Sequence, residues 1–180
     1  MLRYTLRLIG AGLSSRWRPR IGALEANRTA HRAWLADCDP NFHMTEGGYL
    51  VVAGLARLSL WWRMGVFDGW LAHRIRPAAV STAVTFFREI RPYRRFDIVS
   101  RLITWDDRYT FFEHRFERDG RDAARVVVRN VFRDRTGVVR PAALLARLGH
   151  AGAAPEMPAE LTHWAAMREA ARAPDPVRPG

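Results

Sequence analysis

The chain has 180 residues, of which 48% are hydrophobic, so it is long enough for one domain with a real core and too short for two. Its formal net charge is +11, but all 29 basic residues are arginines spread along the chain without a nucleic-acid-binding motif beside them, which argues against a nucleic-acid partner. No apolar run reaches the roughly 18 to 20 residues that a membrane-spanning helix needs, and the single cysteine, Cys38, excludes an intrachain disulfide, so we expect a cytoplasmic protein.

Residues 1–20 have the pattern of an amphipathic helix. Its apolar side chains recur at spacings of four, three and four and therefore share one helical face: Leu2, Leu6, Ile9 and Leu13. Arg7 interrupts the apolar centre that a signal peptide would need. Two interpretations remain open. The helix packs on its own domain or on a dimer partner, or residues 2–14 lie in the plane of an anionic membrane as a peripheral anchor.

The first predicted strand, Arg28 to Ala36, alternates loosely between polar and apolar residues and ends in a polar segment. That segment holds three carboxylates and an imidazole, and it reads Asp37-Cys38-Asp39-Pro40-Asn41-Phe42-His43-Met44-Thr45-Glu46-Gly47-Gly48-Tyr49. It runs directly into an apolar stretch. Polar groups are therefore placed at the start of a helix, where unpaired N–H groups can hold an anion or polarise a carbonyl oxygen.

A long helix is predicted from Glu46 to Met64. Thr45 is a suitable N-cap, and the Glu46 carboxylate in the first turn suits the helix dipole. Apolar residues occur nearly all around this helix, so we expect the rest of the domain to enclose it.

Four alternating segments follow and predict an antiparallel meander of strands: Val80 to Ile90, Phe96 to Trp105, Arg108 to Arg118 and Ala123 to Arg133. Asp119-Gly120 predicts a tight hairpin, because glycine accepts the positive φ that such turns require.

The C-terminal region predicts two short helices, Pro141 to Leu148 and one around Leu161, separated by a linker and followed by a proline-rich tail. We therefore expect three parts: an amphipathic helix over 1–20, one domain over 21–149, and a linker, short helix and flexible tail over 150–180. The spacing of the six histidines predicts no metal site.

One strand, one enclosed helix and a meander of long strands is the order of the hot-dog fold, an α+β fold in which an antiparallel sheet wraps around a long central helix. The polar segment also resembles the Asp-x-Asp-x-x-x-His-hydrophobic motif of hot-dog thioesterases of the 4-hydroxybenzoyl-CoA thioesterase type. The resemblance covers Arg28 to Gly149. It implies hydrolysis of an acyl-CoA or acyl-carrier thioester, with coenzyme A as part of the substrate and no other cofactor. It also implies a homodimer or higher homo-oligomer.

The resemblance assigns roles to individual residues. Asp39 matches the motif aspartate that acts as nucleophile or general base, His43 matches the motif histidine, and Tyr49 matches a tyrosine early in the helix. The backbone N–H groups of Glu46 and Gly47 match those that polarise the thioester carbonyl and hold the oxyanion.

Other matches concern the substrate and a departure from the motif. Trp105 and Arg108 resemble a segment that meets the nucleotide of coenzyme A. Thr45-Glu46 stands where two asparagines are usual in the most similar group, so two amide donors are missing. Glu46 adds a carboxylate where other hot-dog thioesterases carry a catalytic glutamate, and we rank it second to Asp39 as the catalytic carboxylate.

Structural roles remain open for the same residues. Asp37 or Asp39 could satisfy N–H groups of the turn, and His43 could bond a backbone carbonyl. The thiolate of Cys38 is disfavoured beside two carboxylates. Two other functions also remain: a non-catalytic acyl or lipid binder, and a hot-dog hydratase, although hydratases space Asp and His by five residues and Asp39 and His43 are four apart.

Overall fold

The computed structural model describes residues 17–68 and 74–170, together with Arg7, Gly10, Gly12 and Ser15. Most of the predicted N-terminal helix, including residues 2–6, and the tail from residue 171 lie outside the described residues. None of the helices in the described part of the chain has the length and hydrophobicity that a membrane span requires.

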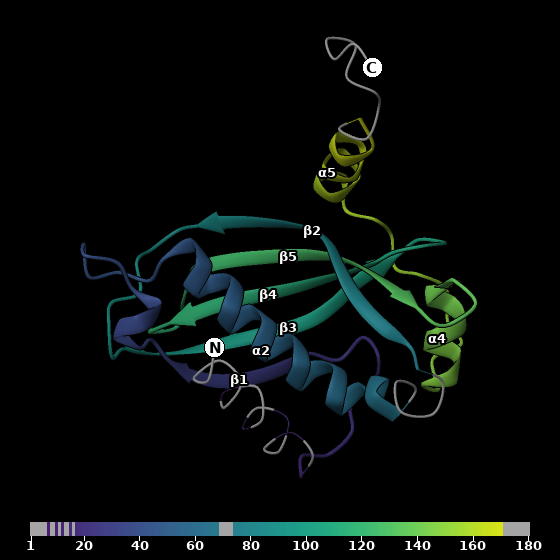
Figure 1. Cartoon of the computed structure of the whole chain (residues 1–180), viewed down its shortest axis with the longest axis horizontal. Helices are drawn as coiled ribbons and strands as arrows, with labels where there is room; N and C mark the ends of the chain where they lie inside the picture. Colours follow the sequence, from purple (N-terminus) through teal and green to yellow (C-terminus); the bar gives the residue numbers. More distant parts are fainter. Residues whose placement is uncertain are drawn as a thin grey trace.

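One antiparallel sheet and one long helix form the body of the protein (Figure 1). The strands run in the order β1-β3-β4-β5-β2, and β6 pairs with β5. The elements are β1 (Asn27–Arg32), the 3-10 helix η1 (Leu35–Asp37), α2 (Glu46–Met64), β2 (Arg76–Phe86), β3 (Arg95–Trp105), β4 (Thr110–Arg118), β5 (Arg121–Arg133), β6 (Val138–Val139), α4 (Pro141–Arg147) and α5 (Ala159–Ala170).

The helix α2 has the bounds that the sequence predicts. The Thr45 hydroxyl accepts a hydrogen bond from the Gly48 N–H at 3.0 Å and so caps its first turn. At the other end, Gly65 takes the left-handed conformation at φ 83°, which ends the helix. Both signals are local, so the residues beside α2 mark its two ends.

Two predicted strands have boundaries that differ from those in the structure. The first strand ends at Arg32 rather than Ala36, because Leu35–Asp37 turn into η1. The strand predicted over Val80 to Ile90 instead begins at Arg76 and ends at Phe86, where the N–H groups of Phe87 and Arg88 both bond to the Ala123 carbonyl.

The sheet has apolar side chains on both faces. Phe112 and Phe116 of β4 belong to the two core clusters that also contain α2, whereas Phe111, one residue from Phe112, packs with Leu161 of α5. Successive side chains of a strand point to opposite faces. The sheet therefore lies between α2 on one face and α5 on the other.

Candidate active site

A pocket of about 690 Å³ opens beside the first turn of α2. Its wall comes from three places: the polar segment after η1, the N-terminal turns of α2, and the chain that follows β2. The lining residues are Asp39, His43, Met44, Thr45, Glu46, Gly47, Tyr49, Phe86, Phe87, Arg88 and Glu89. Five of the predicted site residues thus lie around one cavity.

Asp39 is held in a tight turn. The backbone N–H and the side-chain amide of Asn41 donate hydrogen bonds to its two carboxylate oxygens at 2.9 and 3.2 Å. The Nδ1 atom of His43 lies 3.6 Å from the Asp39 carboxylate. Burial alone would raise the pKa of the Asp39 carboxyl, but the bonds from Asn41 and the nearby His43 outweigh it and leave the pKa below its ordinary value. Asp39 is therefore ionised at neutral pH.

The start of α2 is fixed against the backbone of Asp37. The N–H and the hydroxyl of Thr45 both bond to the Asp37 carbonyl, at 2.9 and 3.3 Å. Gly48 allows this approach, since a Cβ atom there would collide with the same carbonyl oxygen. The Thr45 hydroxyl also accepts a hydrogen bond from the Gly48 N–H, and the Thr45 carbonyl accepts one from the Tyr49 N–H.

The first N–H groups of a helix have no partner within the helix. Thr45 accepts hydrogen bonds from the N–H groups of Gly48 and Tyr49. The N–H groups of Glu46 and Gly47 therefore stay available beside the pocket, which Glu46 and Gly47 line. They are the donors that an oxyanion requires. The Glu46 side chain is exposed and forms no hydrogen bond or ion pair within the described residues.

An aromatic wall closes the other side of the pocket. Tyr49 is buried, and its ring lies 5.1 Å from those of both Phe86 and Phe116. Its hydroxyl donates to the Arg88 carbonyl at 3.4 Å, and burial raises the pKa of Tyr49 to about 12. Phe86 and Phe87 are about half exposed at the pocket rim. This wall suits an apolar acyl group.

Asp37 and Cys38 have surroundings that fit structural roles. The carboxylate of Asp37 is buried and bonds to Arg7 at 2.7 Å and to the Trp34 N–H at 3.1 Å. Burial, together with the charges of Asp37 and Asp39, raises the pKa of the Cys38 thiol. The thiol is thus a poor nucleophile at neutral pH.

Trp105 and Arg108 do not reach this pocket. Trp105 is buried in the core cluster at the C-terminal half of α2, with Trp61 and Met64, and its ring packs edge-on against His150. Arg108 lies in the turn between β3 and β4, where its guanidinium is 5.5 Å from the Tyr109 ring. A role for them in nucleotide contact stays a prediction.

Two parts of the site escaped sequence reasoning. Asn41 holds both oxygens of Asp39, and its position two residues after an aspartate was the available signal. Arg88 and Glu89 follow β2 and reach the pocket through the pairing of β2 with β5, which no local pattern encodes. Among the described residues, no three His, Cys, Asp or Glu side chains gather as a metal site would require.

Comparison with known proteins places these observations in a family. The model of the thioesterase-like superfamily matches residues 33–165. Protein THEM6 of Xenopus laevis is 34% identical over 82 residues, covering 44% of this chain and 39% of that protein. The thioesterase poxG of Penicillium oxalicum is 26% identical over 167 residues, covering 72% of this chain and 55% of the fungal protein. The chain thus spans about half or less of the length of these curated relatives.

A solved structure shows that the architecture is shared. The probable thioesterase YbaW from Escherichia coli superimposes with a TM-score of 0.60 at 19% sequence identity, over 67% of this chain and 94% of the bacterial one.

Proposed function

The chain belongs to the thioesterase-like superfamily and has its hot-dog fold, and from this premise we propose that it hydrolyses the thioester of an acyl-CoA or of an acyl group on a carrier protein. One observation carries the proposal. An ionised carboxylate, Asp39, and the free N–H groups at the start of α2 line the same pocket, and the opposite wall of that pocket is aromatic.

The chemistry follows from these groups. The thioester carbonyl oxygen is bound by the N–H groups of Glu46 and Gly47, and the acyl chain lies along Tyr49 and Phe86. Asp39 takes a proton from water as the water oxygen bonds to the acyl carbon, and the carbonyl electrons move onto the oxygen. The C–S bond then breaks, and the proton passes to the leaving thiolate. Oxyanion donors contribute about 10²–10³ in rate, and a general base contributes about 10²–10⁴.

Glu46 is the second candidate for the base. Both oxygens of Asp39 already accept hydrogen bonds from Asn41, which stabilises the carboxylate and weakens it as a base. Glu46 has no such partner within the described residues and lines the same pocket. In that case Asp39 holds the turn, and Glu46 takes the proton from water.

We further propose that the working form is a homodimer joined through β2. Among the described strands, β2 lies at the edge of the sheet and pairs only with β5, and it leads into the pocket through Phe86. An open edge of 11 residues is a ready template for a second copy. A partner strand there would lie next to the aromatic wall and extend it.

A non-catalytic acyl binder is the second candidate function. The pocket, the aromatic wall and the helix N–H groups would serve binding equally well. The missing asparagine pair at Thr45-Glu46 favours this alternative.

The experiment measures steady-state thiol release from one good acyl-CoA with the variants Asp39→Asn and Glu46→Asn. If Asp39 is the base, Asp39→Asn lowers turnover by about 10²-fold or more, while Glu46→Asn keeps or raises it because a like charge leaves the site. A loss of that size in Glu46→Asn, with Asp39→Asn nearly silent, would transfer the role to Glu46. Activity within about threefold of wild type in both variants would refute a carboxylate base at this site.

A further inference from the structure

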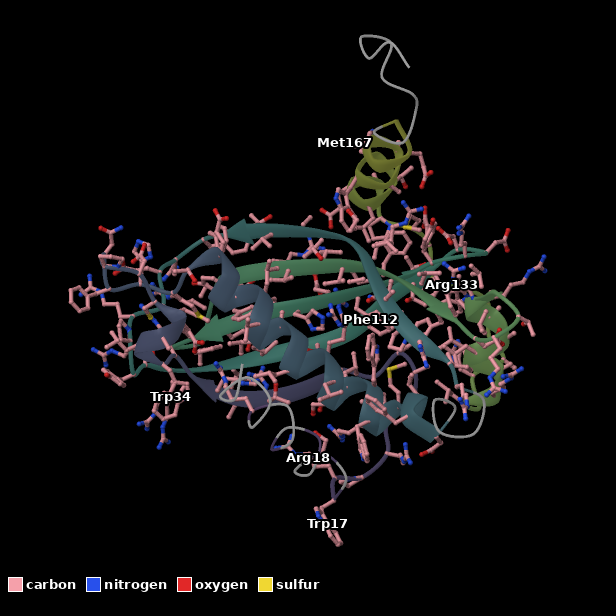
Figure 2. The ribbon with its side chains drawn as sticks, viewed as in Figure 1. Trp17, Arg18, Trp34, Phe112, Arg133 and Met167 are labelled. Carbon is pink, nitrogen blue, oxygen red and sulfur yellow. The ribbon has the colours of Figure 1, made fainter. Side chains whose placement is uncertain are left out.

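Three short loops at one end of the molecule each carry a large apolar side chain at an exposed position. These are Leu35 in η1, Phe42 in the turn after Asp39, and Tyr93 in the turn before β3, with exposed fractions of 51%, 65% and 57%. All three line one groove of about 630 Å³. Figure 1 shows the loops at the end of the sheet where α2 begins, and Figure 2 shows Trp34, itself 44% exposed, at the same end.

Folding does not explain the aromatic residues at two of these positions. Phe42 and Tyr93 have φ angles of 58° and 63°, in the left-handed region that glycine and asparagine adopt with least strain. A bulky side chain in this region costs free energy. Neither side chain recovers that cost by burial, since both are more than half exposed.

Unneutralised arginines border the same loops. Arg32 and Arg95 lie directly opposite each other in the pairing of β1 with β3, an arrangement of like charges that destabilises a sheet. No carboxylate of the described residues forms an ion pair with either of them or with Arg94. Four residues away on β1, Arg28 is neutralised by Asp97 at 3.0 Å and Glu117 at 2.7 Å. Other arginines of the sheet, such as Arg28 and Arg101, are thus paired with carboxylates, whereas Arg32, Arg94 and Arg95 have no carboxylate partner among the described residues.

Backbone hydrogen bonds connect the segments that carry this surface of exposed apolar side chains and arginines, and Arg94 itself lines the groove. The Tyr93 N–H bonds to the Ala33 carbonyl at 2.7 Å, and the Ala33 N–H bonds to the Arg94 carbonyl at 3.0 Å, which ties the segment between β1 and η1 to the turn before β3. Phe42 is three residues from Asp39, so this surface adjoins the mouth of the candidate active site.

We propose that this surface docks on an anionic lipid bilayer. Leu35, Phe42 and Tyr93 enter the interface between headgroups and acyl chains, while Arg32, Arg94 and Arg95 contact lipid phosphates. The mouth of the pocket then faces the layer in which an amphiphilic acyl substrate partitions. The docking itself does not rest on the proposed hydrolysis, and it can be measured without turnover.

A bilayer fits the geometry better than a soluble acidic protein does. The apolar residues stand at the tips of three separate loops, a form that can insert between lipids, whereas protein interfaces bury their anchors in a well-packed centre. Aromatic residues next to arginines are also the composition of membrane-interface positions.

The test is sedimentation of the full chain with vesicles of phosphatidylcholine, with and without phosphatidylglycerol. The variant Phe42→Asn/Tyr93→Asn suits this test, because asparagine tolerates the left-handed backbone and the fold should be kept or stabilised. We expect it to weaken binding to the anionic vesicles about tenfold or more. Arg94→Gln/Arg95→Gln should remove the preference for phosphatidylglycerol. The matched control, Val138→Ser/Met167→Ser, changes two exposed apolar residues elsewhere and should bind as wild type does.

Four results would overturn the proposal. Wild-type protein that fails to sediment with anionic vesicles would do so directly. Equal loss of binding in the control pair and in Phe42→Asn/Tyr93→Asn would show that this surface is not the specific contact. Undiminished binding of Phe42→Asn/Tyr93→Asn would place the membrane contact elsewhere, for example in residues 2–14. Binding of a soluble acidic acyl carrier protein, abolished by Phe42→Asn/Tyr93→Asn while vesicles are ignored, would assign the surface to a protein partner.

Discussion

At the scale of single residues, the two candidate catalytic carboxylates, Asp39 and Glu46, differ in their surroundings. Asp39 is fixed by Asn41 and lies next to His43, whereas the exposed Glu46 projects from the first turn of α2 without a partner among the described residues. A motif could indicate both residues, because spacing along the chain fixes their distance from the helix start. A motif cannot indicate the hydrogen bonds to Asp39, because these bonds depend on the conformation of the turn.

Trp105 shows the limit of such residue assignments. The family resemblance assigns it to substrate contact, which stays a prediction, and its side chain is buried in the core cluster that also holds Trp61 and Met64. Alternation along a strand gives the face on which a residue lies. It does not say which end of α2 the residue meets.

His31 makes the stability of the protein sensitive to acid. Burial, with a contribution from Arg7, lowers the pKa of His31 from 6.5 to about 4. The unfolded chain therefore binds a proton between pH 6.5 and 4 that the folded chain does not, and stability falls as the pH decreases through this range. The upper bound is roughly 3 kcal/mol at pH 4.

Denaturant unfolding from pH 7 to pH 4 tests this prediction. We expect His31→Gln to lose less stability over that interval than wild type does, while the exposed His163→Gln follows wild type. A His31→Gln curve parallel to the wild-type curve would show that His31 is not the residue responsible.

At the scale of elements, the N-terminus of α2 depends on how closely it approaches the backbone of Asp37. Gly48 has no room for a Cβ atom against the Asp37 carbonyl, whereas a Cβ atom on the neighbouring Gly47 would meet only the Thr45 hydroxyl at 3.9 Å. We therefore expect Gly48→Ala to destabilise the fold by about 1–3 kcal/mol through overpacking.

Thermal unfolding of Gly48→Ala beside Gly47→Ala gives a matched comparison. Gly47→Ala should be neutral or stabilising, because alanine favours the helix by up to about 1 kcal/mol over glycine. Equal melting temperatures for the two variants would contradict the close contact at Gly48.

Elements differ in how well the sequence predicts them. Both ends of α2 are marked by residues next to them, Thr45 and Gly65, and its bounds could be predicted. The end of β1 is different, since the Ala33 N–H bonds to the carbonyl of Arg94, 61 positions along the chain. The bonds of Phe87 and Arg88 to Ala123 likewise end β2 through a distant partner.

At the scale of the whole molecule, the free edge of β2 should determine the oligomeric state. Thr82 and Thr85 are exposed on this strand. Charges on an edge strand oppose pairing with a second copy. We expect wild type to have the mass of two chains by light scattering, and Thr82→Lys/Thr85→Lys to have the mass of one.

The same variant tests whether the site needs its partner. If the second copy completes the aromatic wall, the monomeric variant should lose activity while keeping its fold. A wild-type protein that is already monomeric would contradict the proposed dimer.

The decisive measurement of the proposed hydrolysis is thiol release from a panel of acyl-CoAs and acyl carrier proteins whose acyl groups vary in chain length and include aromatic ones. We expect wild-type protein to hydrolyse at least one thioester, with turnover falling about 10²-fold or more when the catalytic carboxylate, Asp39 or Glu46, is replaced by asparagine. Acyl groups that bind in the pocket with no thiol released from any member of the panel would contradict it and leave an acyl-binding protein.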